Sequence, residues 1–366
     1  MSTRTAGGAR TLGRKYYTSE AVFETETDRI FLKRWLYAGR ASALRGAGSF
    51  FLFELDSESV IVVRDGTGEI NAFHNTCRHR GTRLTEEAEG RFAKSIQCPY
   101  HAWTYGLDGS LIGAPFMDEV PSFCKEDYPL HPVSVAVWEG GVFLNLDPAA
   151  EPFETTFAPL MGRFDRWRWG ELEVAHRLTY EIRANWKLVF QNYSECYHCP
   201  SLHPVLNQLT PFRNASNDLE EGPFLGGPMR MAISGGSMTM SGQRCAAPLG
   251  DLAGEDLDLV QYYTVFPNML LSLHPDYVLI HRIDRIAVDR TRVVCDWLFH
   301  PDAIAVEDFD PGDAVELWNM TNKQDWTISE LSQAGVSSRA YEPGPYSELE
   351  SMVAAWDREY LRALGE

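Results

Sequence analysis

The chain has 366 residues, of which 44% are hydrophobic, and this is enough to build the cores of about two domains. Its 33 Lys and Arg stand against 51 Asp and Glu, and the resulting net charge of -18 argues against a nucleic-acid partner. No run of about twenty apolar residues is present to span a membrane, and the basic N-terminal segment lacks the apolar stretch of a secretory signal. We therefore expect a cytoplasmic protein with no membrane partner, whose acidic surface suits a cationic substrate or a basic redox partner.

The first elements predicted along the chain are a helix and a small antiparallel β domain. Thr18 or Ser19 is suited to cap a helix, and apolar residues follow at near-helical spacing from Phe23 to Trp35. The apolar and β-branched runs 51–55 and 60–63, with Asp-Gly turn dipeptides at 65–66 and 108–109, indicate hairpins. We expect the β domain to end at a strand over 142–146 and the segment 148–152 to connect it to a second domain.

Two Cys-His pairs within the β domain indicate an iron-sulfur site. One residue separates Cys77 from His79, and two separate Cys98 from His101. A Rieske [2Fe-2S] cluster needs this ligand set, because two thiolates hold one iron and two imidazoles hold the other. Residues 80–97 are long enough for a hairpin that brings the two loops face to face. These four residues are the predicted cluster ligands.

A structural zinc site is the competing interpretation of the same four residues. Such sites usually begin with Cys-x(2–4)-Cys and keep their two His together, whereas here Cys and His alternate. Gly81, Pro99 and the aromatic residues Tyr100, Trp103 and Tyr105 beside the pairs also favour the cluster.

The second domain begins with a segment that combines a helical pattern with metal-binding side chains. An apolar stripe at helical spacing consists of Trp186, Val189, Phe190, Tyr193 and Tyr197, with Asn185 as the N-cap. The opposite face would hold Lys187, Gln191, Glu195 and His198.

His198 and His203 are candidate ligands of a single metal ion. On an unbroken helix, residues five apart point about 140 degrees away from each other. Pro200 disfavours helix at Cys199, so we expect the chain to turn there and bring His203 back toward His198. One known site type joins two His with one carboxylate around a metal that keeps open positions, and here the carboxylate would have to come from elsewhere in the chain.

The seven cysteines do not form the framework of a secreted disulfide protein. We expect those outside the cluster to be buried thiols that form no bridges: Cys124, Cys196, Cys199, Cys245 and Cys295. Cys196 and Cys199 also admit a zinc or redox interpretation around His198, but no second pair follows at zinc-like spacing.

The remainder of the chain is predicted as strands and a final helix. Strands are expected over 260–266, 277–283 and 292–299, and a helical stripe runs from Leu349 through Met352, Val353 and Trp356 to Tyr360. Residues 213–258 show no sustained period and are either a surface excursion or a lid over a pocket; we favour the lid.

The motifs together resemble the catalytic alpha component of the Rieske non-heme iron oxygenases. They are Cys-Arg-His-Arg-Gly from Cys77, Cys-Pro-Tyr-His-Ala-Trp from Cys98, Asn-Trp-Lys from Asn185, Glu-Cys-Tyr-His-Cys from Glu195 and the His203-Pro204 pair. The resemblance extends from Tyr16 to the C-terminus.

This resemblance implies an α+β fold of two domains. The implied boundaries are an N-terminal helix over 1–36 that packs on the catalytic domain, a Rieske β domain over 37–148, and a helix-grip catalytic domain over 149–366, in which helices pack on an antiparallel sheet. It also implies a homotrimer in which electrons pass between subunits. The chain lacks a dinucleotide fingerprint and plant-type cysteine spacing, so a separate flavin and iron-sulfur reductase must supply electrons from NAD(P)H.

The resemblance also assigns the remaining site residues. Asp325 is implied as the third ligand of the mononuclear Fe(II), with Asp313, Glu316 and Glu330 as alternatives. Glu195, three residues before the first iron histidine, is implied to bridge His198 to a cluster histidine of a neighbouring subunit, for which we choose His101. Asn192 is included with Glu195 among the catalytic residues. Most ring dioxygenases have Asp at the bridging position, so Glu indicates another branch.

Glu-Cys-Tyr-His-Cys and the tail 338–347 are similar to the branch that includes choline, glycine betaine and carnitine monooxygenases. This implies use of O2 to hydroxylate, and thereby N-demethylate, a small quaternary ammonium compound. Aromatic faces can bind such a cation. The candidates for this role are Phe212, Phe224, Tyr262, Tyr263, Phe266, Tyr277 and Trp297.

Two other functions remain open at this point. An aromatic ring-hydroxylating oxygenase would use the same metals on an apolar ring. A Rieske electron-transfer protein would use the cluster alone and leave His198, His203 and Asp325 without a purpose.

Overall fold

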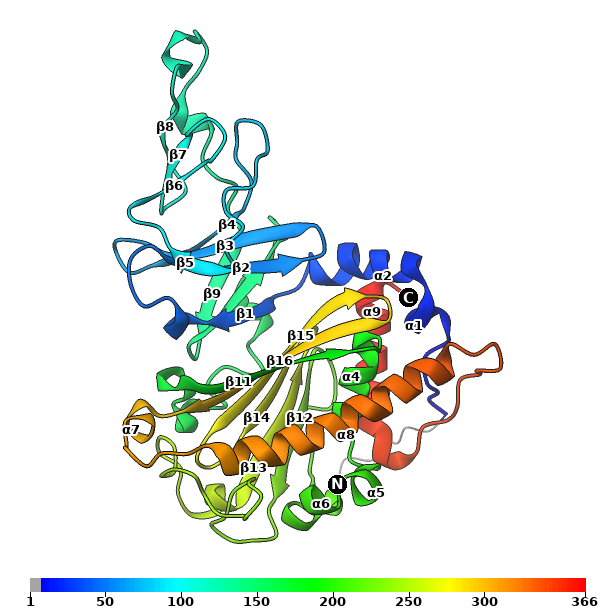
Figure 1. Cartoon of the computed structure of the whole chain (residues 1–366). Coiled ribbons are helices and arrows are strands. Elements are labelled where there is room, and N and C mark those ends of the chain that lie inside the picture. Colours follow the sequence, from blue (N-terminus) through cyan, green and yellow to red (C-terminus); the bar gives the residue numbers. More distant parts are fainter. Residues whose placement is uncertain (1–7) are drawn as a thin grey trace. The chain divides into compact units, whose positions relative to one another are not determined.

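A computed structural model describes residues 8–366 of the chain, which form two compact units (Figure 1). One unit comprises residues 32–153, and the other joins the residues up to Phe31 to residues 154–366. Residues 1–7 lie outside the described residues. They belong to the predicted N-terminal segment, in which no secretory signal was expected. Both units combine antiparallel sheets with helical segments, and the expected α+β fold is confirmed.

The unit 32–153 is built from three small antiparallel sheets. The first has the order β1 (Leu36–Arg40), β10 (Gly141–Asn145) and β9 (Ser134–Trp138). The second has the order β4 (Ile70–His74), β3 (Glu58–Arg64), β2 (Ser49–Leu55) and β5 (Glu89–Arg91). The third consists of β6 (Ser95–Gln97), β7 (Thr104–Gly106) and β8 (Leu111–Gly113). The hairpins predicted from residue 49 onward are therefore present.

A six-stranded antiparallel sheet forms the centre of the other unit (Figure 1). Its order is β11 (Glu173–Ile182), β16 (Arg290–Phe299), β15 (Val278–Ala287), β14 (Met269–Leu273), β13 (Leu259–Val265) and β12 (Phe224–Arg230). The predicted strands over 260–266, 277–283 and 292–299 correspond to β13, β15 and β16 and are confirmed, whereas β11, β12 and β14 were not predicted.

Helices of the same unit pack against this sheet and each other. The main ones are α8 (Gly312–Val336), α4 (Trp186–Tyr193) and α9 (Ser351–Leu364), and Figure 1 shows α8 running across the sheet. The shorter ones are α1 (Lys15–Thr18), α2 (Glu20–Glu26), α5 (Cys199–Leu202), α6 (Pro204–Leu209) and α7 (Pro301–Ile304), while α3 (Phe153–Thr156) lies at the boundary between units. Ser19 caps α2 and Asn185 caps α4, as predicted. The predicted helical stripe is wrong beyond Tyr193, because α4 ends there and Tyr197 is exposed.

A buried ionic cluster holds the N-terminal helices against α4 and α9. Glu26 is fully buried and forms an ion pair with Lys187, which is also fully buried. Its carboxylate accepts further hydrogen bonds from Trp186 Nε1 at 2.8 Å and Tyr360 Oη at 2.7 Å. Three segments far apart in the sequence therefore share one buried carboxylate.

The long excursion after residue 213 is fixed at several points. Asp276, at the turn between β14 and β15, accepts hydrogen bonds from Ser237 Oγ at 2.5 Å and from the Cys245 amide at 2.7 Å. Burial raises the pKa of the Asp276 carboxyl to about 6, although these hydrogen bonds oppose the shift. Tyr277 Oη donates to the Met238 carbonyl at 2.5 Å. The middle of the excursion thus packs at the end of the central strands β14 and β15.

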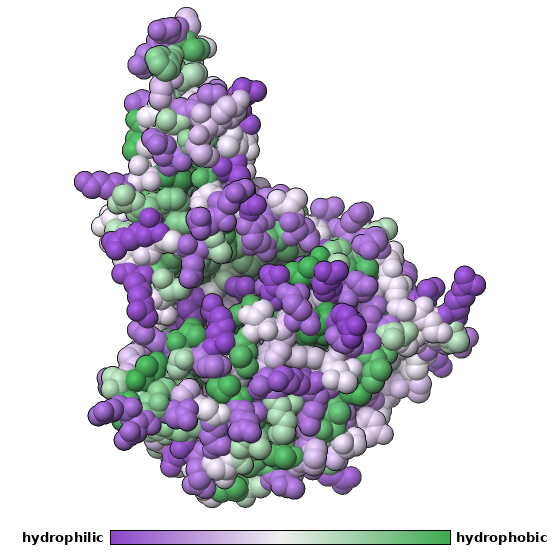
Figure 2. Space-filling view, viewed as in Figure 1, coloured by the Kyte–Doolittle hydropathy of each residue, from purple (hydrophilic) through white to green (hydrophobic). Residues whose placement is uncertain are grey.

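On the face seen in Figure 2, hydrophilic residues cover much of the surface and apolar ones form smaller groups among them. Within residues 8–366, no helix combines the length and the apolarity needed to cross a bilayer.

Candidate active site and metal centres

Two matching loops of the unit 32–153 carry the predicted cluster ligands. Cys77 and Cys98 are 2% and 3% exposed, and each closes a tight turn in which its carbonyl accepts the amide of Gly81 or Ala102. Gly81 and Ala102 both have positive φ, +76° and +56°, so the two loops turn in the same way. The structure brings the four predicted residues together at the facing ends of these loops.

The metal-binding atoms of these loops fall into two groups: the cysteine sulfurs are buried, and the histidine nitrogens lie nearer the surface. Burial raises the pKa of the Cys98 thiol, which also contacts Cys77. The partly exposed rings of His79 and His101 lie 4.7 Å apart between centroids, and Trp103 stacks on His79 at 4.8 Å. Two buried thiols and two outer imidazoles fit a cluster with sulfur ligands on one iron and nitrogen ligands on the other.

The hydroxyl of Tyr105 provides an outer contact to this site. Tyr105 Oη lies 3.4 Å from Cys77 Sγ and accepts a hydrogen bond from the Arg78 amide at 3.0 Å. Hydrogen bonds to cluster sulfurs are one of the ways in which a protein sets the potential of an iron-sulfur centre. Tyr105 was predicted only as part of the aromatic surroundings.

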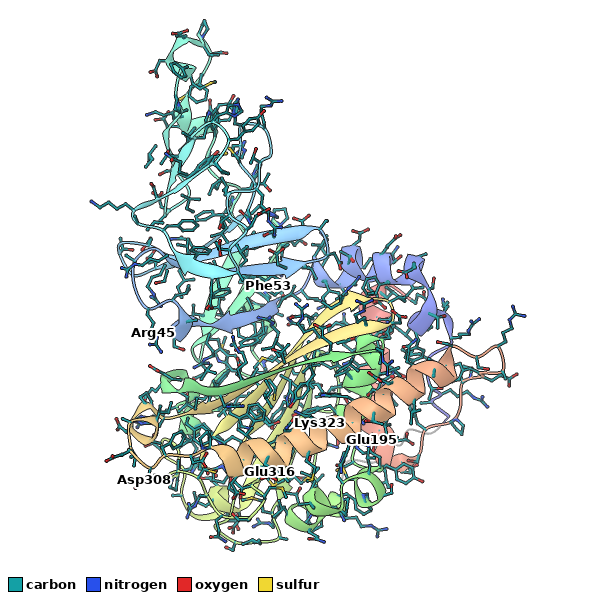
Figure 3. The ribbon with its side chains drawn as sticks, in the orientation of Figure 1. Arg45, Phe53, Glu195, Asp308, Glu316 and Lys323 are labelled. Atoms are coloured by element: carbon teal, nitrogen blue, oxygen red, sulfur yellow. A yellow bond between two sulfur atoms is a disulfide. The ribbon has the colours of Figure 1, made fainter. Side chains whose placement is uncertain are left out.

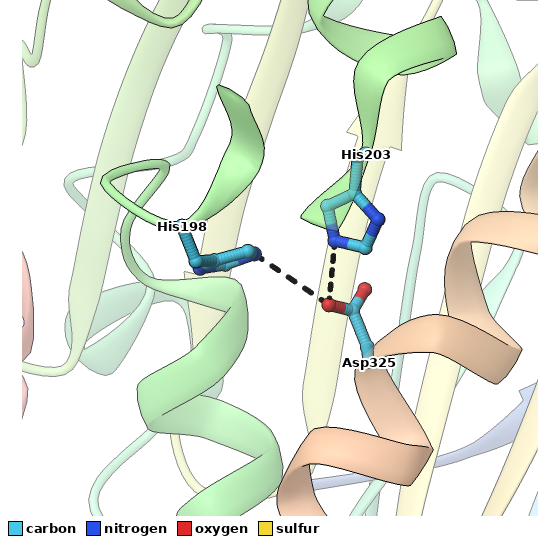
Figure 4. A group of neighbouring side chains, drawn as sticks. All are labelled: His198, His203 and Asp325. Atoms are coloured by element: carbon cyan, nitrogen blue, oxygen red, sulfur yellow. Dashed lines mark hydrogen bonds and ion pairs between the residues drawn. The ribbon is translucent and has the colours of Figure 1, made fainter. Parts of the chain in front are cut away.

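The second group of ligands lies in the catalytic unit (Figure 4). His198, His203 and Asp325 each offer a donor atom, and these atoms lie within 4.8 Å of one another. Asp325 Oδ1 is 2.8 Å from His203 Nε2 and 3.5 Å from His198 Nε2. Two imidazoles and one carboxylate around a common point fit a mononuclear non-heme iron with open positions.

Two helix breaks place the histidines. α4 ends at Tyr193, and His198 is the N-cap of the next short helix, α5. His203 then has non-helical φ and ψ of -123° and 63°, because it precedes Pro204, the first residue of α6. The turn predicted at Pro200 is therefore corrected: Pro200 lies in the first turn of α5, and the chain bends at His203 instead.

Asp325 comes from α8, and the alternatives on that helix are placed elsewhere. Asp313 accepts hydrogen bonds from Ser241, and Glu330 pairs with Arg183 at 2.8 Å. Glu316 is exposed on α8 (Figure 3).

Carboxylates determine the electrostatics of the site. Burial alone would lower the pKa of His198, but hydrogen bonds to Asp325 and Glu195 raise it to about 9. Burial disfavours the charged form of Asp325, yet its hydrogen bonds to His198 and His203 lower its pKa. The field of the two carboxylates thus favours positive charge between the imidazoles, which is the charge that a divalent metal ion would supply.

Each imidazole is also held through its other ring nitrogen. Glu195 Oε1 lies 2.5 Å from His198 Nδ1, and Gln324 Oε1 lies 2.7 Å from His203 Nδ1. Gln324 was missed in the sequence, although its position immediately before Asp325 was a usable signal.

Cys196 and Cys199 are joined by a disulfide, so the prediction of two free thiols there is wrong. The sequence Cys-x-x-Cys at the start of α5 brings the Cα atoms to 4.9 Å, within disulfide range. Of the other three cysteines outside the cluster, Cys295 is buried, Cys245 is partly exposed and Cys124 is exposed. The expectation of a buried thiol is therefore wrong for Cys124, which lies in an open turn.

A cavity of about 480 Å³ opens onto the two histidines and Asp325. Tyr193, Tyr262 and Trp318 form an aromatic wall: Tyr262 lies 6.3 Å from Tyr193 and 6.2 Å from Trp318 between ring centroids. The hydroxyl of Tyr262 is buried and finds no hydrogen-bond partner within residues 8–366. Asn192 also lines the cavity. A buried polar group left unsatisfied beside a cavity is available to a ligand.

Of the seven aromatic residues predicted for the pocket, Phe212 and Tyr262 line it. The other five are placed in the core, and this corrects the prediction. Phe224 packs on Phe157, Tyr263 on Phe164, Phe266 on Trp186 and Trp356, Tyr277 on Phe299, and Trp297 on His176. Tyr193 and Trp318 were not predicted for this role, because nothing local to them distinguishes a cavity wall from a core.

Only part of the excursion 213–258 covers the cavity. Residues 213, 215 and 217, with 225–227 and 229, line it, whereas the lining residues that the structure describes include none from 230 to 258. The C-terminal residues Glu348, Leu349, Ser351 and Met352 complete the wall, a role that was not predicted for them.

Comparisons with known proteins agree with this geometry. Residues 34–124 match the Rieske [2Fe-2S] domain, and residues 169–366 match the ring hydroxylating alpha subunit (catalytic domain). The chain therefore belongs to the Rieske non-heme iron oxygenases, as an alpha subunit, and the resemblance inferred from its motifs is confirmed. It is an oxidoreductase with a Rieske cluster and a mononuclear non-heme iron, and it depends on a reductase.

Several relatives are oxygenase subunits of monooxygenases. The chain is 32% identical over 369 residues to the glycine betaine monooxygenase oxygenase subunit of Pseudomonas aeruginosa, covering 92% of this chain and 85% of the relative. It is 36% identical over 198 residues to the carnitine monooxygenase oxygenase subunit of Escherichia coli, covering 54% and 53% of the two chains.

Solved structures share the fold. The quaternary ammonium Rieske monooxygenase CntA superimposes with a TM-score of 0.83 at 25% identity, over 100% of this chain and 99% of the other. Naphthalene 1,2-dioxygenase from Rhodococcus superimposes with a TM-score of 0.80 at 20% identity, over 97% and 94% of the two chains, which is a likeness of fold alone.

Proposed function

We propose that this chain is the oxygenase subunit of a monooxygenase that hydroxylates an N-methyl group of a small quaternary ammonium compound. The observation that carries the proposal is the aromatic wall of Tyr193, Tyr262 and Trp318 in the cavity that also contains His198, His203 and Asp325. Aromatic faces attract quaternary ammonium groups, which cannot donate hydrogen bonds. The relatives matched over most of their length, which act on glycine betaine, support the same substrate class.

The ligand roles follow from the same geometry. Cys77, His79, Cys98 and His101 would hold the Rieske cluster, and His198, His203 and Asp325 would hold the mononuclear iron. Glu195 would couple His198 to His101 of a neighbouring subunit in a homotrimer; its hydrogen bond to His198 Nδ1 supports the first half of that bridge. A separate flavin and iron-sulfur reductase would supply the electrons from NAD(P)H.

When bound, the iron supplies the site at which O2 is activated with electrons from the cluster. The overall step inserts one oxygen atom into an N-methyl C–H bond and reduces the other to water, using two electrons and two protons. The resulting carbinol loses formaldehyde, leaving the demethylated amine. The aromatic wall would hold the cation beside the iron, and its apolar faces would keep water from the reacting carbon.

The test is a reconstituted reaction with NADH, a reductase and purified protein carrying both metal centres. Glycine betaine and choline are tested beside indole and naphthalene. We expect formaldehyde in equal amount to the O2 consumed with at least one quaternary amine. Coupled O2 uptake with the arenes alone, without formaldehyde, would refute the proposal and favour ring hydroxylation.

A matched pair of variants tests whether the aromatic wall of the cavity binds the quaternary amine. Tyr262→Leu removes the ring but keeps the residue apolar, whereas Tyr263→Leu alters the neighbour that packs away from the cavity against Phe164. We expect the first change to raise KM for the quaternary amine about tenfold or more, since a desolvated cation–π contact contributes about 2 kcal/mol. The second change should affect stability more than KM.

A further inference from the structure

An exposed arginine that lines the cavity has no carboxylate partner within residues 8–366. Arg213 is the only Lys or Arg among the cavity-lining residues that the structure describes. Its guanidinium lies 5.4 Å from the ring of Phe212, and no carboxylate of residues 8–366 lies within ion-pair distance of it.

Three arginines near Arg213 in the chain are paired with carboxylates, whereas Arg213 is not paired within the part of the chain that the structure describes. Arg163 pairs with Asp218 at 2.6 Å, Arg168 with Asp251 at 2.8 Å and Arg230 with Asp258 at 3.7 Å. The chain has a net charge of -18, so acidic partners are abundant. An arginine left unpaired at a cavity is therefore available for an anionic group of a ligand.

The backbone that carries Arg213 is held in place on both sides. The Phe212 amide donates to Asn207 Oδ1 at 3.0 Å, and the Asn214 amide donates to the Pro211 carbonyl at 2.8 Å. Asn214 Nδ2 also donates to the Arg230 carbonyl at 3.2 Å. These contacts hold the backbone at Arg213 without a hydrogen bond from its guanidinium, which lies against the Phe212 ring.

Arg213 is separated from the metal ligands by a helix. α6 begins directly after His203 and has six residues, which corresponds to a rise of about 9 Å, and Arg213 follows its end. Arg213 and the metal ligands thus line the same cavity from different segments of the chain. A ligand that reaches both must have two ends.

The hydrogen-bond donors of the cavity that lack an acceptor among the described residues indicate the chemistry of the second end of the ligand. Arg213 has only donors, and the buried Tyr262 hydroxyl has a donor without an acceptor within residues 8–366. A carboxylate supplies acceptors for such donors, whereas the hydroxyl of an amino alcohol supplies no negative charge. Glu348, which also lines the cavity, adds attraction for the cationic end.

We propose that Arg213 binds the carboxylate of a zwitterionic substrate whose quaternary ammonium end lies at the metal site. This inference rests on the proposed function and narrows its substrate class to betaines. Arg213 is then a specificity-determining residue: it selects carboxylated quaternary amines over uncarboxylated ones with the same trimethylammonium group.

The test measures binding to the purified holoenzyme without O2, by calorimetry, for glycine betaine and choline. These probes share the trimethylammonium group and differ at the other end. We expect the wild type to favour glycine betaine and Arg213→Gln to reduce the ratio of the two affinities about tenfold, with Arg213→Lys in between. Glu348→Gln should weaken both ligands by a similar factor, and Arg230→Gln, outside the cavity lining, should change neither.

Equal wild-type affinities, or an equal loss for both ligands in Arg213→Gln, would overturn the inference. The proposed function has a separate failure, because it requires formaldehyde from a quaternary amine. Formaldehyde from choline and glycine betaine alike, unchanged in ratio by Arg213→Gln, would remove the role of Arg213 while leaving N-demethylation intact.

Discussion

Gln324 accepts a hydrogen bond from His203 Nδ1 at 2.7 Å, while the next residue of the same helix, Asp325, lies 2.8 Å from Nε2 of that ring. A metal-bound imidazole is neutral and carries one proton, so with a metal present the bond to Gln324 assigns that proton to Nδ1 and leaves Nε2 for the metal. Glu195 acts in the same way at Nδ1 of His198. Both rings therefore direct Nε2 toward the same carboxylate.

Gln324→Leu should weaken iron binding while the cluster stays intact. The variant removes the acceptor that orients His203, and loss of such a partner typically costs 10- to 100-fold in metal affinity. The measurement is iron retained per chain after dialysis against a graded chelator. Gln324→Glu, which keeps an acceptor, should restore most of the affinity, and Lys323→Leu, an exposed neighbour on α8, should leave it unchanged (Figure 3). Equal retention in Gln324→Leu and wild type would show that Gln324 does not position the ligand.

Asp325→Ala should empty the mononuclear site. Removing the only anionic ligand leaves two imidazoles, which hold Fe(II) weakly, so the iron content should fall from three to two per chain. The visible absorption of the cluster should persist, because its ligands lie in the other compact unit. Glu316→Ala, an exposed acid on the same helix, serves as the control. Three irons and full activity in Asp325→Ala would move the carboxylate ligand elsewhere.

The local motifs explain why much of the site could be predicted from the sequence. Cluster ligands lie in pairs on two turns, and His198 and His203 flank a proline-containing stretch, so spacing alone brings each pair near one site. Asp325 is different, because it is 122 residues from His203 and only the tertiary fold joins them. It could be chosen through the family resemblance but not from spacing.

The aromatic lining could not be predicted, because strand faces decide it. Tyr262 and Tyr263 are adjacent on β13 and point to opposite faces, the first to the cavity and the second to Asp218 and Phe164. A shift of one residue in the assumed register exchanges their roles. The sequence pattern in this stretch is apolar on both faces, so it does not distinguish them.

The unpredicted strand β12 has a physical explanation in its composition. It contains Gly226, Gly227 and Pro228, residues that usually argue against a strand. At the edge of the sheet they are tolerated, and Gly226 is required: its φ is +145°, and a Cβ there would lie 2.0 Å from the Tyr262 carbonyl oxygen. A larger residue would push the strand away from the cavity wall.

Glu195→Gln should keep both metal centres and slow the passage of electrons between them. The amide can still contact His198 but loses the charge that stabilises its protonated or metal-bound state. The measurement is the rate at which the reduced cluster reoxidises when substrate and O2 are added. A drop of about tenfold or more at unchanged iron content is expected, with Glu316→Gln as the control. Loss of iron instead would identify Glu195 as a ligand.

Glu26→Ala should strongly destabilise the catalytic unit. It leaves Lys187 charged and fully buried without its carboxylate, which costs about 3–5 kcal/mol in such pairs. Urea unfolding followed by circular dichroism gives the change. The double variant Glu26→Met with Lys187→Met should recover much of the loss, whereas Arg183→Ala, which breaks an exposed pair with Glu330, should cost about 1 kcal/mol or less. A small effect of Glu26→Ala would mean that the cluster contributes little.

The buried ring of His274 should make the fold sensitive to acid. Burial lowers its pKa from 6.5 to about 3, and neither ring nitrogen has a partner within residues 8–366. Below pH 6.5 the unfolded chain therefore binds a proton at this residue that the folded chain does not bind until about pH 3. The contribution of the neutral His274 ring to the free energy of unfolding is complete above pH 6.5. It is lost as the pH falls from 6.5 toward 3, and the loss reaches about 2 kcal/mol at pH 5.

Comparison with a variant isolates this effect, since Asp276 and Asp357 have raised pKa values of about 6 and contribute with the opposite sign. Those carboxyls are neutral in the folded chain at a pH where the unfolded chain has ionised them, so they favour folding as the pH falls. In His274→Gln they remain while the histidine is absent. Urea unfolding from pH 7.5 to 5 should therefore show the free energy of unfolding of the wild type falling by about 2 kcal/mol more than that of His274→Gln. His300→Gln, at a partly exposed histidine, serves as the control and should follow the wild type. Parallel curves for wild type and His274→Gln would show that the His274 ring is protonated in the folded protein as readily as in the unfolded chain.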